Sequence, residues 1–170
     1  MSSKKLTPKW NGSKEGYIDD NGDWAIDPVF DEADFFGDGI ARVRVEDKWG
    51  WIDTNGGWVI KPRFKDARNF VEDRAAVKVY GEKWSYIDRD GKRITMSTFD
   101  SARDFSYGFA AVEVKDEWGF INRDGEMVIK PWLEEVGAFT PTGLYAKATL
   151  DGAEGWIDTT GTWHKELPKK

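Results

Sequence analysis

The chain has 170 residues, of which 39% are hydrophobic and 33% charged, the composition of a globular domain with a core and not of a disordered chain. No stretch approaches the roughly 20 consecutive apolar residues that a membrane helix requires, so we expect no membrane partner. Because cysteine is absent, disulfides and thiolate chemistry are excluded.

The charge is unevenly distributed. Residues 1–14 carry four lysines and no acidic residue, and residues 165–170 carry a net charge of +2. Because the overall charge is −6, the remaining residues 15–164 carry −12. An acidic body of this kind repels phosphate backbones, so we expect no nucleic-acid partner. It favours a basic protein or peptide, although acidity also keeps an aromatic-rich protein soluble.

The first ten residues, MSSKKLTPKW, contain lysines but no apolar segment typical of a signal peptide. We therefore expect a cytoplasmic protein, with secretion left open. Residues 6–10, followed by Asn11-Gly12, are expected to form the first strand of the fold.

One short string, an aromatic residue followed by isoleucine and Asp or Asn, recurs five times at intervals of 34 to 36 residues. Its isoleucines are Ile18, Ile52, Ile87, Ile121 and Ile157. A turn pair follows each string, namely Asn21-Gly22, Asn55-Gly56, Asp90-Gly91, Asp124-Gly125 and Thr160-Gly161. Such pairs between β-prone runs predict hairpins, and the preceding Asp or Asn is expected to accept backbone N–H groups of the turn.

A further strand precedes each later hairpin, at residues 40–45, 75–79, 109–114 and 145–150. The alternation is seen in the first of them, where Ala41, Val43 and Val45 face one side and Arg42 and Arg44 the other. The sequence thus predicts an all-β protein of five three-stranded antiparallel meanders in one domain, 1–170. The repeat units are about 6–39, 40–74, 75–108, 109–143 and 144–167.

Proline follows the second strand of three hairpins, as Pro28, Pro62 and Pro131. Because proline donates no backbone hydrogen bond, that strand is expected at the sheet edge. Each connector then reads Phe-x-x-Ala-x-x-Phe or a close variant, as at 30–36. Its three-residue spacing suggests a tight turn or a short 3₁₀ piece.

Trp51 and Ile52 are adjacent in the middle strand, so they point to opposite faces of the sheet, and both are large and apolar. Each sheet must therefore be covered on both faces, which stacking of consecutive units achieves. A closed, propeller-like ring is favoured because five complete units are present, and an open superhelical stack is the alternative.

Residues 48–53 read Lys-Trp-Gly-Trp-Ile-Asp, and a glycine turn, Val-Ile-Lys-Pro at 59–62 and the aromatic connector follow. With Gly-Phe-Ala-Ala-Val at 108–112, these motifs resemble the WG (KWG) repeat of bacterial proteins over residues 15–164. The third copy departs from the pattern at Ser85 and Met96-Ser97, and the last lacks the Ile-x-Pro segment. The resemblance implies a β-repeat binding scaffold and supplies no catalytic residues.

The sequence offers no catalytic or metal-binding constellation. His164 is the single histidine, which leaves no imidazole cluster for a metal, and nothing in its spacing suggests a Ser-His-Asp set around it. The Asp19-x-Asn21 string resembles half of a calcium loop but lacks the remaining ligands. We therefore expect no enzyme activity, no cofactor and no metal.

Four aromatic residues stand at positions where most other copies are polar: Phe35, Tyr80, Tyr107 and Trp132. Such positions are expected to be solvent-exposed, and exposed aromatics are enriched where proteins bind partners. These four residues are the candidate binding site.

The preferred hypothesis is a monomeric, non-catalytic scaffold that binds a basic protein or peptide, in an adaptor or toxin-neutralising role. One alternative is a carbohydrate-binding module that uses Trp24, Trp58 and Trp163 as sugar platforms. Another is an acidic mimic of nucleic acid.

Overall fold

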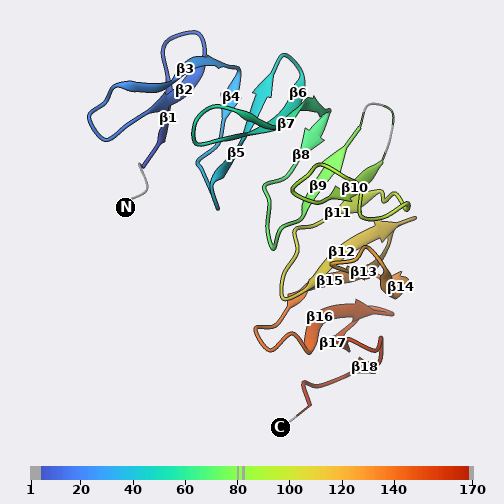
Figure 1. Cartoon of the computed structure of the whole chain (residues 1–170). Coiled ribbons are helices and arrows are strands. Elements are labelled where there is room, and N and C mark those ends of the chain that lie inside the picture. Colours follow the sequence, from blue (N-terminus) through green and yellow to red (C-terminus); the bar gives the residue numbers. More distant parts are fainter. Residues whose placement is uncertain (1–4, 80, 82, 169–170) are drawn as a thin grey trace. The chain divides into compact units, whose positions relative to one another are not determined.

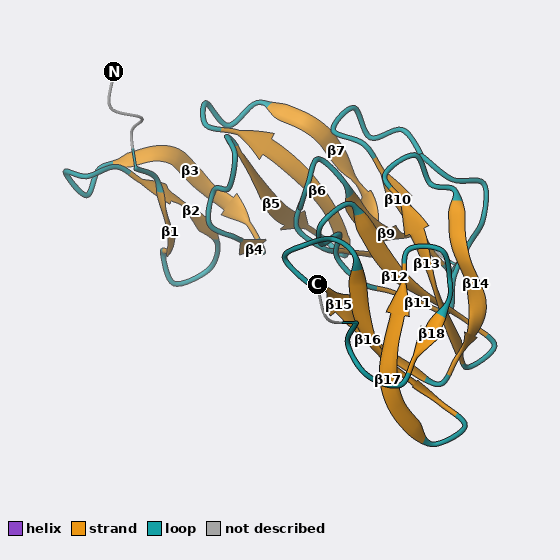
Figure 2. Cartoon of the chain, turned by 90° about the horizontal axis from the view of Figure 1, so that it is seen from below, coloured by secondary structure: helices purple, strands orange, loops and turns teal. Residues whose placement is uncertain are grey.

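The computed structural model describes residues 5–79, 81 and 83–168. Within these residues every regular element is a β-strand, which confirms the all-β prediction (Figure 1). The backbone contacts divide the chain into two compact units, residues 1–69 and 70–170, each described by itself. Figure 2 shows the described strands joined by turns and loops.

The first unit contains two antiparallel sheets. The first sheet has the order β1-β2-β3 and the second the order β4-β5-β6-β7. Their strands are β1 (Thr7–Trp10), β2 (Glu15–Ile18), β3 (Trp24–Phe30), β4 (Glu32–Ala33), β5 (Ile40–Val45), β6 (Lys48–Asp53) and β7 (Trp58–Phe64), after which β8 (Asp66–Ala67) ends the unit.

The second unit begins with the hairpin of β9 (Ala75–Lys78) and β10 (Trp84–Ile87), which belongs to the third sheet. The fourth sheet has the order β11-β12-β13-β14, and the fifth the order β15-β16-β17-β18. Their strands are β11 (Ser101–Ala102), β12 (Phe109–Val114), β13 (Glu117–Asn122), β14 (Met127–Leu133), β15 (Glu135–Phe139), β16 (Tyr145–Leu150), β17 (Ala153–Asp158) and β18 (Trp163–His164).

Most predicted strands match the observed ones. The ranges 40–45, 109–114 and 145–150 are β5, β12 and β16, and each pairs antiparallel with the strand that follows. The proline-containing strands β3, β7 and β14 lie at sheet edges, as predicted. An edge places the proline, which has no N–H, where no ladder bond is lost.

The connectors differ from the prediction of a tight turn or 3₁₀ piece. The connector before β5 forms β4, in which Ala33 pairs with Val43, and equivalent strands open the fourth and fifth sheets. The backbone N–H of Asp34 donates to the carbonyl of Arg42 at 3.0 Å. The extra strand covers the open edge of the meander, so these sheets have four strands and not the predicted three.

The five turns share one construction, as predicted. The carboxylate of Asp53 accepts the backbone N–H groups of Asn55 and Gly57, at 2.8 and 2.9 Å. The same pair of bonds is made by Asp19, Asp88, Asn122 and Asp158. In the calcium-like string, therefore, one oxygen of Asp19 serves the turn.

Consecutive sheets pack face to face within each unit. In the first unit, Tyr17 and Ile26 of the first sheet form one core with Ala41, Val43 and Ile52 of the second. In the second unit, the β9–β10 hairpin packs in the same way on the fourth sheet, and the fourth on the fifth. The predicted stacking is confirmed inside both units.

The middle strands are buried on both faces, as predicted. Trp51 is 1% exposed and its neighbour Ile52 is 0% exposed, although they point to opposite sides of the second sheet. In the first and fifth sheets one of the two neighbours, Ile18 and Trp156 respectively, is only half-buried. Whether the repeats close into a ring or form an open stack stays a prediction, as does the single domain 1–170.

The glycine of the Trp-Gly pair lies directly under the edge strand. A Cβ atom on Gly50 would stand 2.5 Å from the carbonyl oxygen of Ile60, and Gly16 is placed in the same way. The third copy has the buried Ser85 at this position. There, isolated bridges such as Ile87 with Arg93 replace the regular edge strand in the described residues. The departure in sequence thus marks a real departure in structure.

Candidate functional site

The four candidate binding residues are called anchor residues below. Those that the structure describes are exposed, as predicted. Phe35 is 70% exposed, Tyr107 50% and Trp132 36%. Tyr80 lies outside the described residues. The equivalents of Phe35 in the other repeats, Asn69, Asp104 and Ala138, are exposed as well. The position is therefore in solvent whatever residue fills it.

The anchors do not form one cluster within the second unit. Tyr107 lies in the turn before β12, at the end of the fourth sheet where Phe109 pairs with Asn122. Trp132 lies at the opposite end, where Leu133 pairs with Trp118. Phe35 belongs to the first unit. Tyr107 and Trp132 thus belong to separate local surfaces of the second unit.

Tyr107 also occupies an unusual backbone conformation. Its φ angle is 51°, in the left-handed region, and its equivalents Asp38 and Glu72 have φ angles of 48° and 53°. Aspartate tolerates this region comparatively well, whereas a bulky aromatic residue does so at a cost. The turn therefore holds an exposed ring in a position that backbone energetics disfavour.

Sequence reasoning missed a second feature, a guanidinium stacked on the tryptophan of the Trp-Gly pair. The guanidinium carbon Cζ of Arg42, on β5, lies 4.2 Å from the ring centre of Trp49. The Cζ atom of Arg103 lies 4.2 Å from the ring centre of Trp118. Each guanidinium also donates to a carbonyl of the next connector, that of Ala67 or Val136. The two arginines occupy different positions of the repeat, so comparison of equivalent positions between copies does not reveal them.

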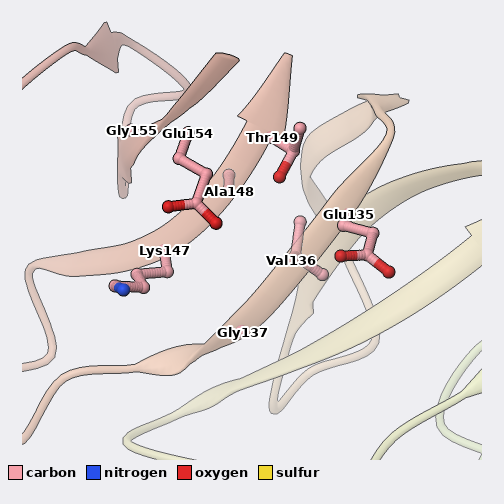
Figure 3. Close-up of a pocket in the computed structure, with 8 residues that line it drawn as sticks. All are labelled: Glu135, Val136, Gly137, Lys147, Ala148, Thr149, Glu154 and Gly155. Atoms are coloured by element: carbon pink, nitrogen blue, oxygen red, sulfur yellow. The ribbon is translucent and has the colours of Figure 1, made fainter. Parts of the chain in front are cut away.

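The fifth sheet lacks this arrangement and has a cavity of about 210 Å³ instead (Figure 3). Glu154 stands where the second and fourth sheets have Trp49 and Trp118, and Gly137 stands in place of Arg103. The lining residues come from β15, β16 and β17, namely Glu135, Val136, Gly137, Lys147, Ala148, Thr149, Glu154 and Gly155.

A second hollow, of about 390 Å³, lies in the first unit beside Trp58. Trp58 is 41% exposed, and its ring stands edge-on to Phe30 at 6.1 Å. Asp27 and Asn55 contribute polar groups to the lining. Of the other proposed sugar platforms, Trp24 is exposed and Trp163 is half-buried.

The single histidine takes part in the last turn. His164 Nε2 and Asp158 Oδ2 lie 2.7 Å apart, and the same carboxylate accepts hydrogen bonds from Thr160 and Thr162. Burial raises the pKa of Asp158, but the hydrogen bonds from His164, Thr160 and Thr162 outweigh burial and hold the pKa well below its usual range.

Across the part of the chain that the structure describes, no three His, Asp or Glu residues gather in a way that would hold a metal ion. The same residues contain no helix long and apolar enough to span a membrane.

Repeated antiparallel sheets, a glycine under each regular edge strand and the turns anchored by Asp or Asn define a β-repeat protein. The family model described as "WG containing repeat" matches residues 16–49, 49–84, 84–118 and 118–146, and the chain belongs to this family. A comparison with curated proteins finds no match.

Similar solved structures agree in fold. The chain is similar to a crystal structure described as the eukaryotic initiation factor, with a TM-score of 0.64, 10% identity and coverage of 96% of this chain and 51% of that one. It is also similar to the computationally designed Ika8 protein, with a TM-score of 0.51, 12% identity and coverage of 98% and 66%.

BamB from Moraxella catarrhalis matches with a TM-score of 0.49, 13% identity and coverage of 96% and 61%. The chain thus spans between 51% and 66% of the length of these three structures. At such low identity the likeness concerns fold alone.

Proposed function

We propose that this protein is a non-catalytic repeat scaffold that binds a basic protein or peptide. The observation that carries the proposal is the exposure of Phe35, 70%, at a position where other copies have Asn69 and Asp104. A rigid aromatic ring in solvent is a typical anchor of protein interfaces. Tyr107, held exposed in a disfavoured turn conformation, supports the same interpretation.

Charge defines the class of partner. The net charge of the chain is −6, and residues 15–164 carry −12. An acidic surface accelerates encounter with basic partners and repels acidic ones, and salt weakens this steering. A basic segment that also supplies apolar contacts to an exposed ring satisfies both observations. An adaptor or toxin-neutralising role is one cellular use of such binding.

The test is selection of peptides from a random displayed library on the purified chain. We expect the selected peptides to be rich in Lys and Arg and to bind less tightly as salt rises. Each peptide should bind either Phe35→Ala or Tyr107→Ala more weakly, according to the ring that it contacts. Trp10→Ala, which removes a ring that is 63% exposed outside the anchor set, is the control. Selection of peptides without basic residues, or equal binding to all variants, would refute the proposal.

Carbohydrate binding is the second candidate, because the exposed ring of Trp58 borders a hollow that also presents Asp27 and Asn55. Sugars combine apolar faces with hydroxyl groups, which suits a ring beside polar side chains. A glycan array decides between the candidates. Binding that Trp58→Ala abolishes without unfolding the protein favours the sugar, whereas an array without any binding removes it.

A further inference from the structure

The fifth sheet leaves open a place that two other sheets fill with an arginine. In the second sheet that arginine is Arg42 over Trp49, and in the fourth it is Arg103 over Trp118. At the two positions from which these side chains start, the fifth sheet has Lys147 and Gly137. The cavity of about 210 Å³ occupies the corresponding space.

Neither replacement fills the cavity. A Cβ atom added to Gly137 would meet no atom closer than 3.6 Å, that of the Lys147 side chain, so the space above this glycine is open. The ammonium of Lys147 lies 6.0 Å from the ring centre of Trp156. Figure 3 shows the Lys147 side chain turned away from the carboxylates of Glu135 and Glu154.

One of the two carboxylates that border the cavity, that of Glu135, has an arginine-binding counterpart within this chain. Glu135 occupies the position of Glu32, and Glu32 forms an ion pair with the guanidinium of Arg44 in the second sheet. At the position of Arg44 the fifth sheet has Thr149, which carries no charge. The fifth sheet thus keeps the carboxylate and lacks the cation that pairs with it in the second.

We propose that this cavity binds the guanidinium of an arginine side chain on the partner, an inference that rests on the proposed protein-binding function. Glu135 and Glu154 place two negative charges at the cavity, and Lys147 supplies one positive charge. The remaining negative charge matches one guanidinium. A planar fork of N–H donors suits two carboxylates on different strands better than a single ammonium does.

The test is a titration of the isotope-labelled full chain, followed by NMR, with N-acetyl-arginine methylamide and with its lysine counterpart. We expect the arginine compound to shift the backbone amide signals of Gly137 and Gly155 saturably, and the lysine compound to bind about tenfold more weakly. Glu135→Gln and Glu154→Gln should each weaken arginine binding several-fold. Glu117→Gln, a change of an exposed glutamate on β13, is the matched control.

The double variant Gly137→Arg with Glu154→Trp reconstructs the stack of the fourth sheet and should fill the cavity from within. We expect it to remain folded and to lose the arginine response. The proposal is overturned if arginine and lysine compounds bind equally, if neither shifts these signals, or if the double variant still responds. Peptide binding by the whole chain is a separate readout: if it persists in the double variant while the arginine compound never bound, the scaffold function stands and the pocket does not.

Discussion

Gly50 and Ile60 approach each other so closely that the glycine admits no side chain. A Cβ atom on Gly50 would lie 2.5 Å from the Ile60 carbonyl oxygen and 2.7 Å from the Pro62 nitrogen. At this point the pairing of β6 with β7 shifts register, between Trp49 and Trp51. The glycine of the Trp-Gly pair is therefore a requirement of the bulged edge strand.

Substitution of this glycine should destabilise the fold. Gly50→Ala must push the β7 backbone away, and we expect the free energy of unfolding to fall by about 1–3 kcal/mol or more. Gly37→Ala is the control, because its Cβ would meet nothing within 4 Å and its φ is not positive. Chemical denaturation of both variants measures the difference, and equal stability of the two would contradict this explanation.

The third copy offers the converse change. Thr95 is buried, 8% exposed, where three of the other copies have the core residues Ile26, Ile60 and Ile129. Its hydroxyl accepts a hydrogen bond from the backbone N–H of Ser97. Thr95→Ile adds buried apolar surface, so we expect a gain in unfolding free energy of about 1 kcal/mol in denaturant titration. A loss of stability would show that the third copy has no room for the core residue of the others.

The arginine stacks should be specific for the guanidinium. Arg103→Ala removes the group that covers Trp118 and donates to the Val136 carbonyl, and we expect a cost of about 1 kcal/mol. Arg103→Lys should recover little of this, because an ammonium lacks the flat face and the fork of donors. Full recovery by lysine, measured by thermal unfolding, would reduce the stack to a simple charge effect.

Acid should weaken the last turn through Asp158. Its folded-state pKa lies below the unfolded value, so the ionised carboxylate contributes stability above about pH 4, which is lost as pH falls through the folded pKa. Asp158→Asn keeps an oxygen for the turn, as Asn122 does in the fourth sheet, but loses the ionised partner of His164. We expect this variant to be less stable than wild type at neutral pH. It should also lose less stability than wild type between about pH 5 and about pH 2, the range over which the Asp158 carboxylate of unfolded wild type becomes protonated.

The same substitution at Asp19 is the control for this prediction. That carboxylate accepts the N–H groups of Asn21 and Asp23 in the equivalent turn. The unfolding free energy of each protein is measured against pH by circular dichroism in denaturant. If it falls in parallel for wild type and Asp158→Asn as the pH is lowered, the role given to the His164 contact is contradicted.

Periodicity made much of the fold predictable. The recurrence of Ile18 and its four equivalents predicted the repeats, and the adjacency of Trp51 and Ile52 predicted burial of the middle strand on both faces. Each inference used contacts between residues close in sequence or equivalent between copies. The exposure of Phe35 followed in the same way, because other copies show which positions tolerate polar residues.

Features that vary between copies were not predictable. Arg42 and Arg103 reach equivalent tryptophans from a strand and from a connector, so only the folded chain shows that they do the same thing. The fourth strand was missed because its two residues, Glu32 and Ala33, are defined by pairing with β5 and not by a pattern of their own. The cavity of the fifth sheet arises from replacements at three separate positions.

Solvent access at Trp51 tests the burial of the middle strand β6 most directly. In protein labelled with fluorotryptophan, with the Trp51 signal assigned by Trp51→Phe, the fluorine NMR signal of Trp51 should not change when water is exchanged for D₂O. The signal of Trp10, which is 63% exposed where Trp51 is 1% exposed, should shift in the same experiment. A solvent shift at Trp51 equal to that at Trp10 would contradict the burial of the middle strand β6 on both faces.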